Sequence, residues 1–168
     1  MTFIGPFLFI LAGIGLDRLV KLWSIERLRD AESVTAIPGV LDLTYLENQG
    51  AAFSMLEGQR WPLIAGTLLI MVLLGVALWK NYFPSGLTRW GCFCVISGAL
   101  GNFIDRLLYG YVVDMFEFTF FEFPVFNVAD VLICVGGGLW VLYLLIELVR
   151  ENRKPKAVDT IEEESHDA

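Results

Sequence analysis

Four stretches of about 20 mostly apolar residues dominate this chain of 168 residues and restrict the folds open to it. A helix of that length, rising about 1.5 Å per residue, crosses the roughly 30 Å hydrocarbon core of a bilayer. With 56% hydrophobic residues, the chain is also too apolar for an ordinary soluble domain of this size. We therefore predict a mainly α-helical membrane protein with four transmembrane helices, at about residues 3–22, 61–79, 90–108 and 126–149.

The two longer connections between these spans predict a small platform with β structure outside the bundle. From Leu41 to Glu47 apolar and polar residues alternate, and the alternation stops at Gln49-Gly50, which predicts a short strand and a turn. The second connection is aromatic-rich and strand-like, so it should lie along the membrane interface. We assign residues 1–150 to one membrane domain, with outer connections at 23–60 and 109–125, and residues 151–168 to a disordered tail.

The distribution of basic residues predicts the side of the membrane on which the termini lie. Four spans place both termini on one side, and a basic cluster follows the last span directly. Because cytoplasmic connections carry an excess of Lys and Arg, we predict cytoplasmic termini, a cytoplasmic tail and an extracytoplasmic platform. The basic residues on the side of the termini are Lys80, Arg89, Arg150, Arg153, Lys154 and Lys156, against Arg27, Arg29, Arg60 and Arg106 on the other side.

Polar and ionisable residues gather near the outer ends of the predicted spans. The first and third spans end, and the fourth begins, on the side away from the cytoplasm. A charged group in hydrocarbon costs a few kcal/mol, so such groups tend to mark functional sites. The residues expected to converge at this level are Asp17, Asn102, Asp105, Arg106, Asn127 and Asp130.

Two groups of these residues have helical spacing. Asp17 and Lys21 stand four positions apart and can pair on one helix face, which favours a structural ion pair over a direct role in the site. Asn102, Asp105 and Arg106 are spaced i, i+3, i+4 and share another face. We expect Asp105 to orient Arg106 or to tie the connections together.

Asp114 and Asp130 are the candidates for acid–base chemistry. Both have apolar neighbours, and desolvation raises the pKa of a carboxyl group. Two such carboxyls brought together share one proton, and the pair can then activate water and protonate a leaving group. The alternative is that Asp114 is a surface acid and Asp130 a helix N-terminal charge favoured by the macrodipole.

Other classes of site have little support in the sequence. The single histidine, His166, lies in the predicted tail, and the three cysteines lie within predicted spans without a metal-binding motif. No basic patch with interleaved aromatic residues is present in the sequence. We therefore expect no metal, no cofactor and no nucleic-acid partner.

Five short motifs, in order along the chain, together resemble those of the lipoprotein signal peptidase (signal peptidase II) family. They are "DRLVK" with Asp17 and Lys21, "NQGAAF" with Asn48 and Gly50, "SGALGNFIDR" with Asn102, Asp105 and Arg106, "VVDM" with Asp114, and "FNVAD" with Asn127, Ala129 and Asp130. The chain departs from the family pattern at Gln49, Ser97 and Met115.

The resemblance implies an intramembrane aspartyl endopeptidase of the bacterial cytoplasmic (inner) membrane, with its site near the outer face. Its substrate would be a prolipoprotein whose cysteine carries diacylglycerol, cut just before that cysteine, and its surroundings membrane lipids; we expect a monomer. The resemblance assigns catalysis to Asp114 and Asp130, and substrate binding or site orientation to Asn48, Gly50, Asn102, Arg106, Asn127 and Ala129, leaving Asp17, Lys21 and Asp105 as structural polar residues.

Two alternatives of other classes stay open on the residues alone. The first is a small proton-coupled membrane transporter that uses the carboxyls as a relay, and the second a non-catalytic membrane scaffold. Transport sites tend to lie near the bilayer midplane and between internal repeats. The acids here gather at one predicted surface, which favours the peptidase.

Overall fold

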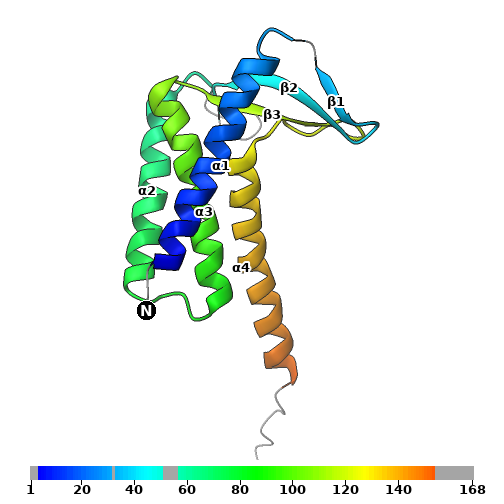
Figure 1. Ribbon diagram of the computed structural model, residues 1–168. Helices are drawn as coiled ribbons and strands as arrows, with labels where there is room; N and C mark the ends of the chain where they lie inside the picture. Colours follow the sequence, from blue (N-terminus) through cyan, green and yellow to red (C-terminus); the bar gives the residue numbers. More distant parts are fainter. Residues whose placement is uncertain (1–3, 32, 51–56, 154–168) are drawn as a thin grey trace, which may run out of the picture.

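The protein is a bundle of four long helices with a small sheet at one end, as seen in a computed structural model (Figure 1). The structure describes residues 4–31, 33–50 and 57–153. The helices are α1 (Ile4–Leu28), α2 (Arg60–Trp79), α3 (Gly86–Leu108) and α4 (Val128–Arg153), and the strands are β1 (Val34–Ile37), β2 (Leu41–Asn48) and β3 (Val112–Phe118).

Three of the helices are long and apolar enough to cross a membrane, namely α2, α3 and α4. The prediction of a mainly helical membrane protein is thereby confirmed. Helix α1 has 25 residues, but every stretch of 18 residues within it contains Asp17, Arg18 and Lys21. Length and composition alone therefore do not mark α1 as a span.

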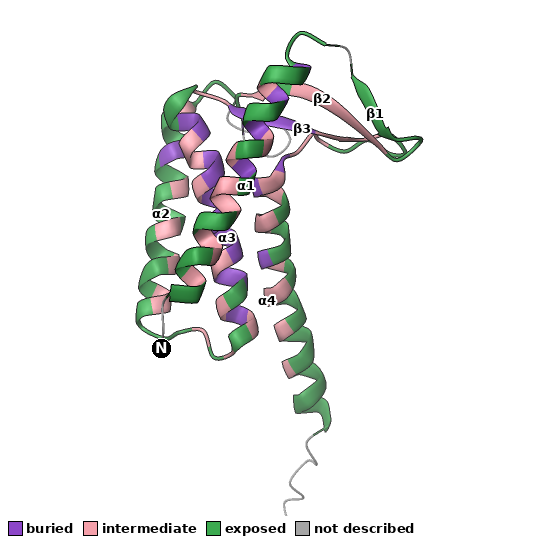
Figure 2. Cartoon of the chain, viewed as in Figure 1, coloured by how far each residue is buried: buried purple, intermediate pink, exposed green. Residues whose placement is uncertain are grey.

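Helix α3 lies at the centre and contacts each of the other three helices. In its apolar stretch 56% of residues are buried, against 11% in α2 and 6% in α4, whose outer faces are exposed and apolar (Figure 2). Small residues on α3 let α4 approach closely: a Cβ added at Gly98 would lie 2.2 Å from the backbone oxygen of Ala129.

The contact between α1 and α3 accounts for one departure from the family pattern. The Ser97 hydroxyl donates a hydrogen bond to the backbone oxygen of Ile10, at 3.1 Å. A Cβ added at Gly13 would lie 2.2 Å from the Ser97 oxygen. The serine is therefore accommodated because the facing residue on α1 is a glycine.

The helix ends differ from the predicted limits for local reasons. Helix α1 continues to Leu28, beyond the predicted end at residue 22, and Leu28 is buried against Val113 and Met115. Helix α3 begins at Gly86 rather than 90, because Ser85 and Thr88 form a capping box. Helix α4 spans Val128–Arg153, so residues 151–153 of the predicted tail are helical, and the rest of that tail lies outside the described residues.

The strands form one antiparallel sheet in the order β1-β2-β3. The strand and turn predicted from residue 41 onward correspond to β2, and the predicted strand-like segment contains β3. The sequence reasoning missed β1, which is short and exposed. The signal that marks it is the Pro38-Gly39 turn, where Gly39 adopts a φ of 71° that favours glycine.

Candidate active site

The candidate site lies at the end of the bundle where the sheet meets α1, α3 and α4 (Figure 1). Helix α3 leads almost directly into β3, which carries Asp114, and α4 carries Asp130 in its first turn. Strand β2 pairs with β3 and ends at Asn48, beside the same region. Asp114 is 1% exposed, so its carboxyl group is shielded from solvent.

A single asparagine joins the two candidate carboxyls, which we call the carboxyl pair. The Asn127 side-chain amide donates to Asp114 Oδ1, and the Asn127 backbone N–H donates to Asp130 Oδ2 at 3.1 Å. The backbone N–H of Asp130 in turn donates to Asn127 Oδ1 at 2.9 Å. Within the described part of the chain the two carboxyls have no direct hydrogen bond, so Asn127 is their link.

Two further asparagines complete the hydrogen bonding of the pair. Asn48 Nδ2 donates to Asp114 Oδ2, and Asn102 Nδ2 donates to Asp130 Oδ1, both at 2.8 Å. Asn127 Nδ2 also donates to Asn102 Oδ1 at 3.1 Å. Every oxygen of the carboxyl pair therefore accepts an N–H group, which suits carboxyls that must exist in ionised form.

The surroundings shift the proton affinity of Asp114 strongly. Burial raises its pKa to about 7, and the negative charge of Asp130 adds to this effect. The hydrogen bonds from Asn48 and Asn127 and the charge of Lys21 act in the opposite direction but are weaker. Asp114 is thus a carboxyl that exchanges its proton near neutral pH, as acid–base chemistry at that pH requires.

A group of charges, which we call the ion cluster, lies next to the pair and consists of the buried Asp17, Lys21 and Asp105 and the half-buried Arg18. Lys21 is completely buried and pairs with Asp17 at 2.9 Å and with Asp105 at 2.8 Å. The predicted pairing of Asp17 with Lys21 is confirmed. Arg18 pairs with the other oxygen of Asp105 and donates to the hydroxyl of Tyr109.

The partners of Asp105 correct one prediction and favour its alternative. Its ion-pair partners are Lys21 and Arg18, so the expectation that it orients Arg106 is wrong. Asp105 also accepts the backbone N–H of Val113 at 3.3 Å, which ties β3 to the helices. Sequence reasoning missed Arg18, because no spacing rule links it to a residue 87 positions away.

Asp17 reaches across to the helix that carries Asp130. Its Oδ1 accepts the backbone N–H of Ala129 at 2.9 Å, in the first turn of α4, where helical N–H groups lack partners within the helix. Gly101 leaves the necessary space, since a Cβ there would lie 2.6 Å from Asp17 Oδ2. Ala129 is completely buried, which supports a site-orienting position rather than an open contact surface.

Arg106 connects α3 to the turn after β2. Its Nη2 donates to the backbone oxygen of Gly50 at 2.7 Å, and the N–H of Gly50 donates to Asn48 Oδ1 at 2.9 Å. The Nε of Arg106 is buried and finds no hydrogen-bond partner among the described residues. Residues 51–56, which include the end of the "NQGAAF" motif, lie outside the described part.

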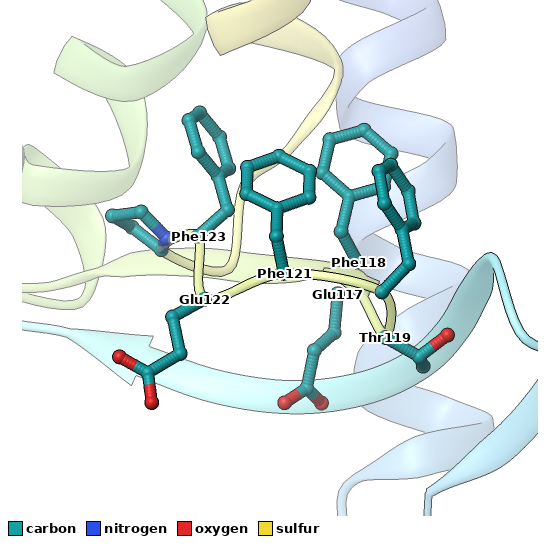
Figure 3. Close-up of a pocket in the computed structure, with 8 residues that line it drawn as sticks. Glu117, Phe118, Thr119, Phe121, Glu122 and Phe123 are labelled. Carbon is teal, nitrogen blue, oxygen red and sulfur yellow. The ribbon is translucent and has the colours of Figure 1, made fainter.

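A separate hollow of ≈ 740 Å³ lies on the connection from β3 to α4, and the carboxyl pair is not among its lining residues. The Phe118 ring centroid lies 5.0–5.8 Å from those of its aromatic neighbours. In Figure 3 the rings of Phe118, Phe121 and Phe123 rise on the side where α4 lies, whereas Glu117 and Glu122 point the opposite way. We call the residues Phe118, Phe120, Phe121 and Phe123 the phenylalanine surface.

A family model and the sequences of related proteins point to the same family. The family model described as signal peptidase (SPase) II matches residues 9–146. The lipoprotein signal peptidase of Streptococcus thermophilus (strain CNRZ 1066) is 46% identical over 138 residues, covering 80% of this chain and 88% of the relative. That of Lactococcus lactis subsp. lactis (strain IL1403) is 40% identical over 142 residues, covering 82% and 91%.

The fold has a close match among solved structures. A structure described as a bacterial membrane enzyme, solved by the in meso method, superposes with a TM-score of 0.81. The two sequences are 29% identical, and the match covers 94% of this chain and 96% of the other.

Proposed function

Because this chain belongs to the signal peptidase II family, we propose that it removes the signal peptide from diacylglyceryl-modified bacterial prolipoproteins, cutting before the lipidated cysteine. It is an aspartic endopeptidase of the membrane. The observation that carries the proposal is the meeting of two aspartates on Asn127 at the end of the bundle that adjoins the sheet. Family membership gives no support to the proton-coupled transporter.

The reaction proceeds through a carboxyl pair that holds one proton. The ionised member takes a proton from water, the resulting hydroxide attacks the scissile carbonyl carbon, and the protonated member donates to the carbonyl oxygen. Collapse of the tetrahedral intermediate breaks the C–N bond, and a proton passes to the leaving amine of the lipidated cysteine. The raised pKa of Asp114 supports this aspartate as the proton donor at neutral pH.

The charge balance of the site, in which Arg18 and Asp130 are half-buried and the other charged groups are buried, supports a single shared proton. Charges in a water-poor interior are stable only when they are compensated, and doubly ionised carboxyls would leave one excess negative charge. The balance is zero when one proton resides on the carboxyl pair. The groups counted are the cations Arg18, Lys21 and Arg106 and the carboxyls Asp17, Asp105, Asp114 and Asp130.

The surrounding residues divide into two sets in this proposal. Residues that touch the carboxyl pair or the turn after β2 orient the site or meet the substrate, and the remaining charged ones hold the helices in place. The first set is Asn48, Gly50, Asn102, Arg106, Asn127 and Ala129, and the second is Asp17, Lys21 and Asp105.

We place α1 across the membrane as the fourth span. Its residues before Asp17 are uncharged, and Phe7, Leu8 and Leu11 are exposed, as a lipid-facing helix requires. Of its charged residues, Asp17 and Lys21 are buried and Arg18 is half-buried, and both of these cations pair with Asp105. The exposed Glu26 and Arg27 lie near the end of α1. Both termini then lie in the cytoplasm and the carboxyl pair near the outer face.

The phenylalanine surface supports the position of the outer membrane boundary. Aromatic rings favour the membrane–water interface, and carboxylates favour water. The rings lie toward α4, whereas Glu117 and Glu122 point the opposite way (Figure 3). We propose that the side with the rings faces lipid and the side with the carboxylates faces water. The protein thus meets the lipidated cysteine, as a monomer, at the depth where that cysteine is anchored.

The function is tested with purified protein and a precursor in two forms, with and without diacylglycerol on its cysteine. We expect the lipidated form to lose its signal peptide, with the modified cysteine as the new N-terminus by mass spectrometry. The unlipidated form should remain intact. Cleavage of neither form, together with proton uptake by liposomes that contain the protein, would favour the transporter instead.

The activity should depend on pH around the shifted pKa of Asp114. As pH rises through about 7, Asp114 loses its proton, the pair becomes doubly ionised, and no acid remains for the carbonyl oxygen. We therefore expect kcat/KM to fall with an apparent pKa near that value, which belongs to the pair as a whole. The measurement is kcat/KM at constant ionic strength across this range. An unchanged rate well into alkaline pH would contradict a protonated carboxyl in the reaction.

A further inference from the structure

The side-chain amide of Asn102 adopts one of two possible orientations, and its shape alone does not determine which one. Its Oδ1 accepts hydrogen bonds from Lys21 Nζ at 2.9 Å and from Asn127 Nδ2 at 3.1 Å, and its Nδ2 donates to Asp130 Oδ1. The oxygen and nitrogen of a carboxamide have nearly the same size, so packing alone permits either orientation. A flipped amide would direct its oxygen at the Asp130 carboxylate.

Lys21 removes this ambiguity by chemistry. An ammonium group has only donors, so it can bind the oxygen of Asn102 and cannot bind its nitrogen. Lys21 is itself held by Asp17 and Asp105, at 2.9 and 2.8 Å, and is completely buried. Its position is therefore fixed, and with it the direction of the amide.

The orientation of the Asn102 amide in turn determines that of Asn127, which contacts the second carboxyl, Asp114. Because Asn102 Oδ1 faces Asn127, the side chain of Asn127 must present its nitrogen there, and the same nitrogen donates to Asp114 Oδ1. The oxygen of Asn127 is then left to accept the backbone N–H of Asp130 at 2.9 Å. Each of the two amides thus donates to one member of the carboxyl pair, Asn102 to Asp130 and Asn127 to Asp114, while Asn127 also donates to Asn102.

We infer that Lys21 is a positioning residue that sets the direction of the Asn102 and Asn127 amides, so that both catalytic carboxyls receive N–H donors. The inference rests on the proposed function and deepens it. Lys21 does not touch the carboxyl pair; it acts through its contact with Asn102 and, at a distance, through the effect of its charge on the pKa of Asp114. A purely structural Lys21 would stabilise the helices and leave the chemistry of a folded enzyme unchanged.

The test compares Lys21→Met with Arg18→Met. Both variants remove one cation from the same carboxylate of Asp105 and from the same helix, but Arg18 has no contact with Asn102. We expect Lys21→Met to lower kcat by about 10- to 100-fold with little change in KM. This factor corresponds to the loss of a hydrogen bond to a charged group that contributes only in the transition state. Arg18→Met should retain most of its kcat.

The pH profile gives a readout that a structural role does not move. The charge of Lys21 lowers the pKa of Asp114, so its loss should move the alkaline limb of kcat/KM to higher pH. Arg18→Met should leave that limb in place. The charged groups around the pair and Lys21 are Asp17 and Arg18 on α1, Asp105 and Arg106 on α3, Asp114 on β3 and Asp130 on α4.

Lys21→Met leaves two buried carboxylates short of a partner and can fail to fold. The double variant Asp17→Asn/Lys21→Met keeps the net charge and, through the asparagine oxygen, an acceptor for the Ala129 N–H. The double variant is compared with the single variant Asp17→Asn, which keeps Lys21. We expect the double variant to have the lower kcat. Equal kcat in the two folded proteins would overturn the inference. The proposed function would fall separately, if Asp114→Asn or Asp130→Asn were active.

Discussion

Replacement of Asp114 or Asp130 with asparagine is expected to lower the rate of prolipoprotein cleavage by about 10³- to 10⁴-fold, the upper range for a general acid or base. Asparagine has almost the same shape as aspartate but can neither take a proton from water nor give one to the carbonyl oxygen. Each carboxyl is held by N–H donors from neighbouring asparagines, and an amide oxygen still accepts such bonds. The change therefore removes the proton chemistry and keeps most of the packing.

The matched control is Glu117→Gln, the same exchange of carboxylate for amide on the same strand. Glu117 lies on β3 three residues from Asp114, and it points away from the bundle (Figure 3). Its activity should remain close to that of the unaltered protein. Cleavage is followed by the shift of the lipidated precursor on a gel, and appreciable turnover by either aspartate variant would remove that aspartate from the reaction.

Thermal unfolding separates loss of chemistry from loss of fold. The pKa of Asp114 is higher in the folded protein, at about 7, than in the unfolded chain, at about 3.9. The folded state therefore binds the proton more tightly, and this contribution to stability is present below pH 3.9 and lost as pH rises through 7. An asparagine at this position cannot ionise, so Asp114→Asn should be at least as stable as the unaltered protein at alkaline pH.

Gly98→Ala is expected to give the largest loss of stability among single substitutions between α3 and α4. The added Cβ would lie 2.2 Å from the backbone oxygen of Ala129 and 2.9 Å from Ile133 Cγ1. A backbone atom cannot turn aside as a flexible side chain does, so the two helices must move apart. Overpacking of this kind costs about 1–3 kcal/mol and occasionally more.

The displacement should also affect catalysis, because Ala129 is the residue directly before Asp130. We expect a lower unfolding temperature in detergent together with a fall in kcat. Gly138→Ala on α4 is the control, since a Cβ there meets nothing within 4 Å. If Gly98→Ala unfolded at the same temperature as Gly138→Ala, the close contact of α3 with α4 would be refuted.

The length of the apolar stretches predicted the helices, and the alternation of apolar and polar residues predicted β2, because each is encoded by a local pattern. The helix ends were less predictable, since Leu28 extends α1 only through its burial against Val113 and Met115. The strand β1 was missed because its side chains are exposed and carry no alternation of burial. Local patterns therefore predict the elements, and tertiary contacts decide where they stop.

In the candidate site, too, features set by local sequence were predictable and those set by tertiary contacts were not. The apolar settings of Asp114 and Asp130 along the chain made a carboxyl pair one of two open interpretations, and the resemblance to the family favoured the pair. The partners of Asp105 were not predictable, because Arg18 and Asp105 lie 87 positions apart. The direction of the Asn102 amide was equally unpredictable, because it depends on Lys21 of α1 and on Asn127 and Asp130 at the start of α4, all far from Asn102 in the sequence.

The bond from the Ala129 N–H to Asp17 has a consequence for the order in which the protein assembles. The acceptor belongs to α1, whereas the donor belongs to α4, 112 residues later. Until the start of α4 has been synthesised, the carboxylate on α1 lacks this amide. The hydrogen bonding around Asp17 is therefore completed only when the segment that carries Asp130 joins the other helices.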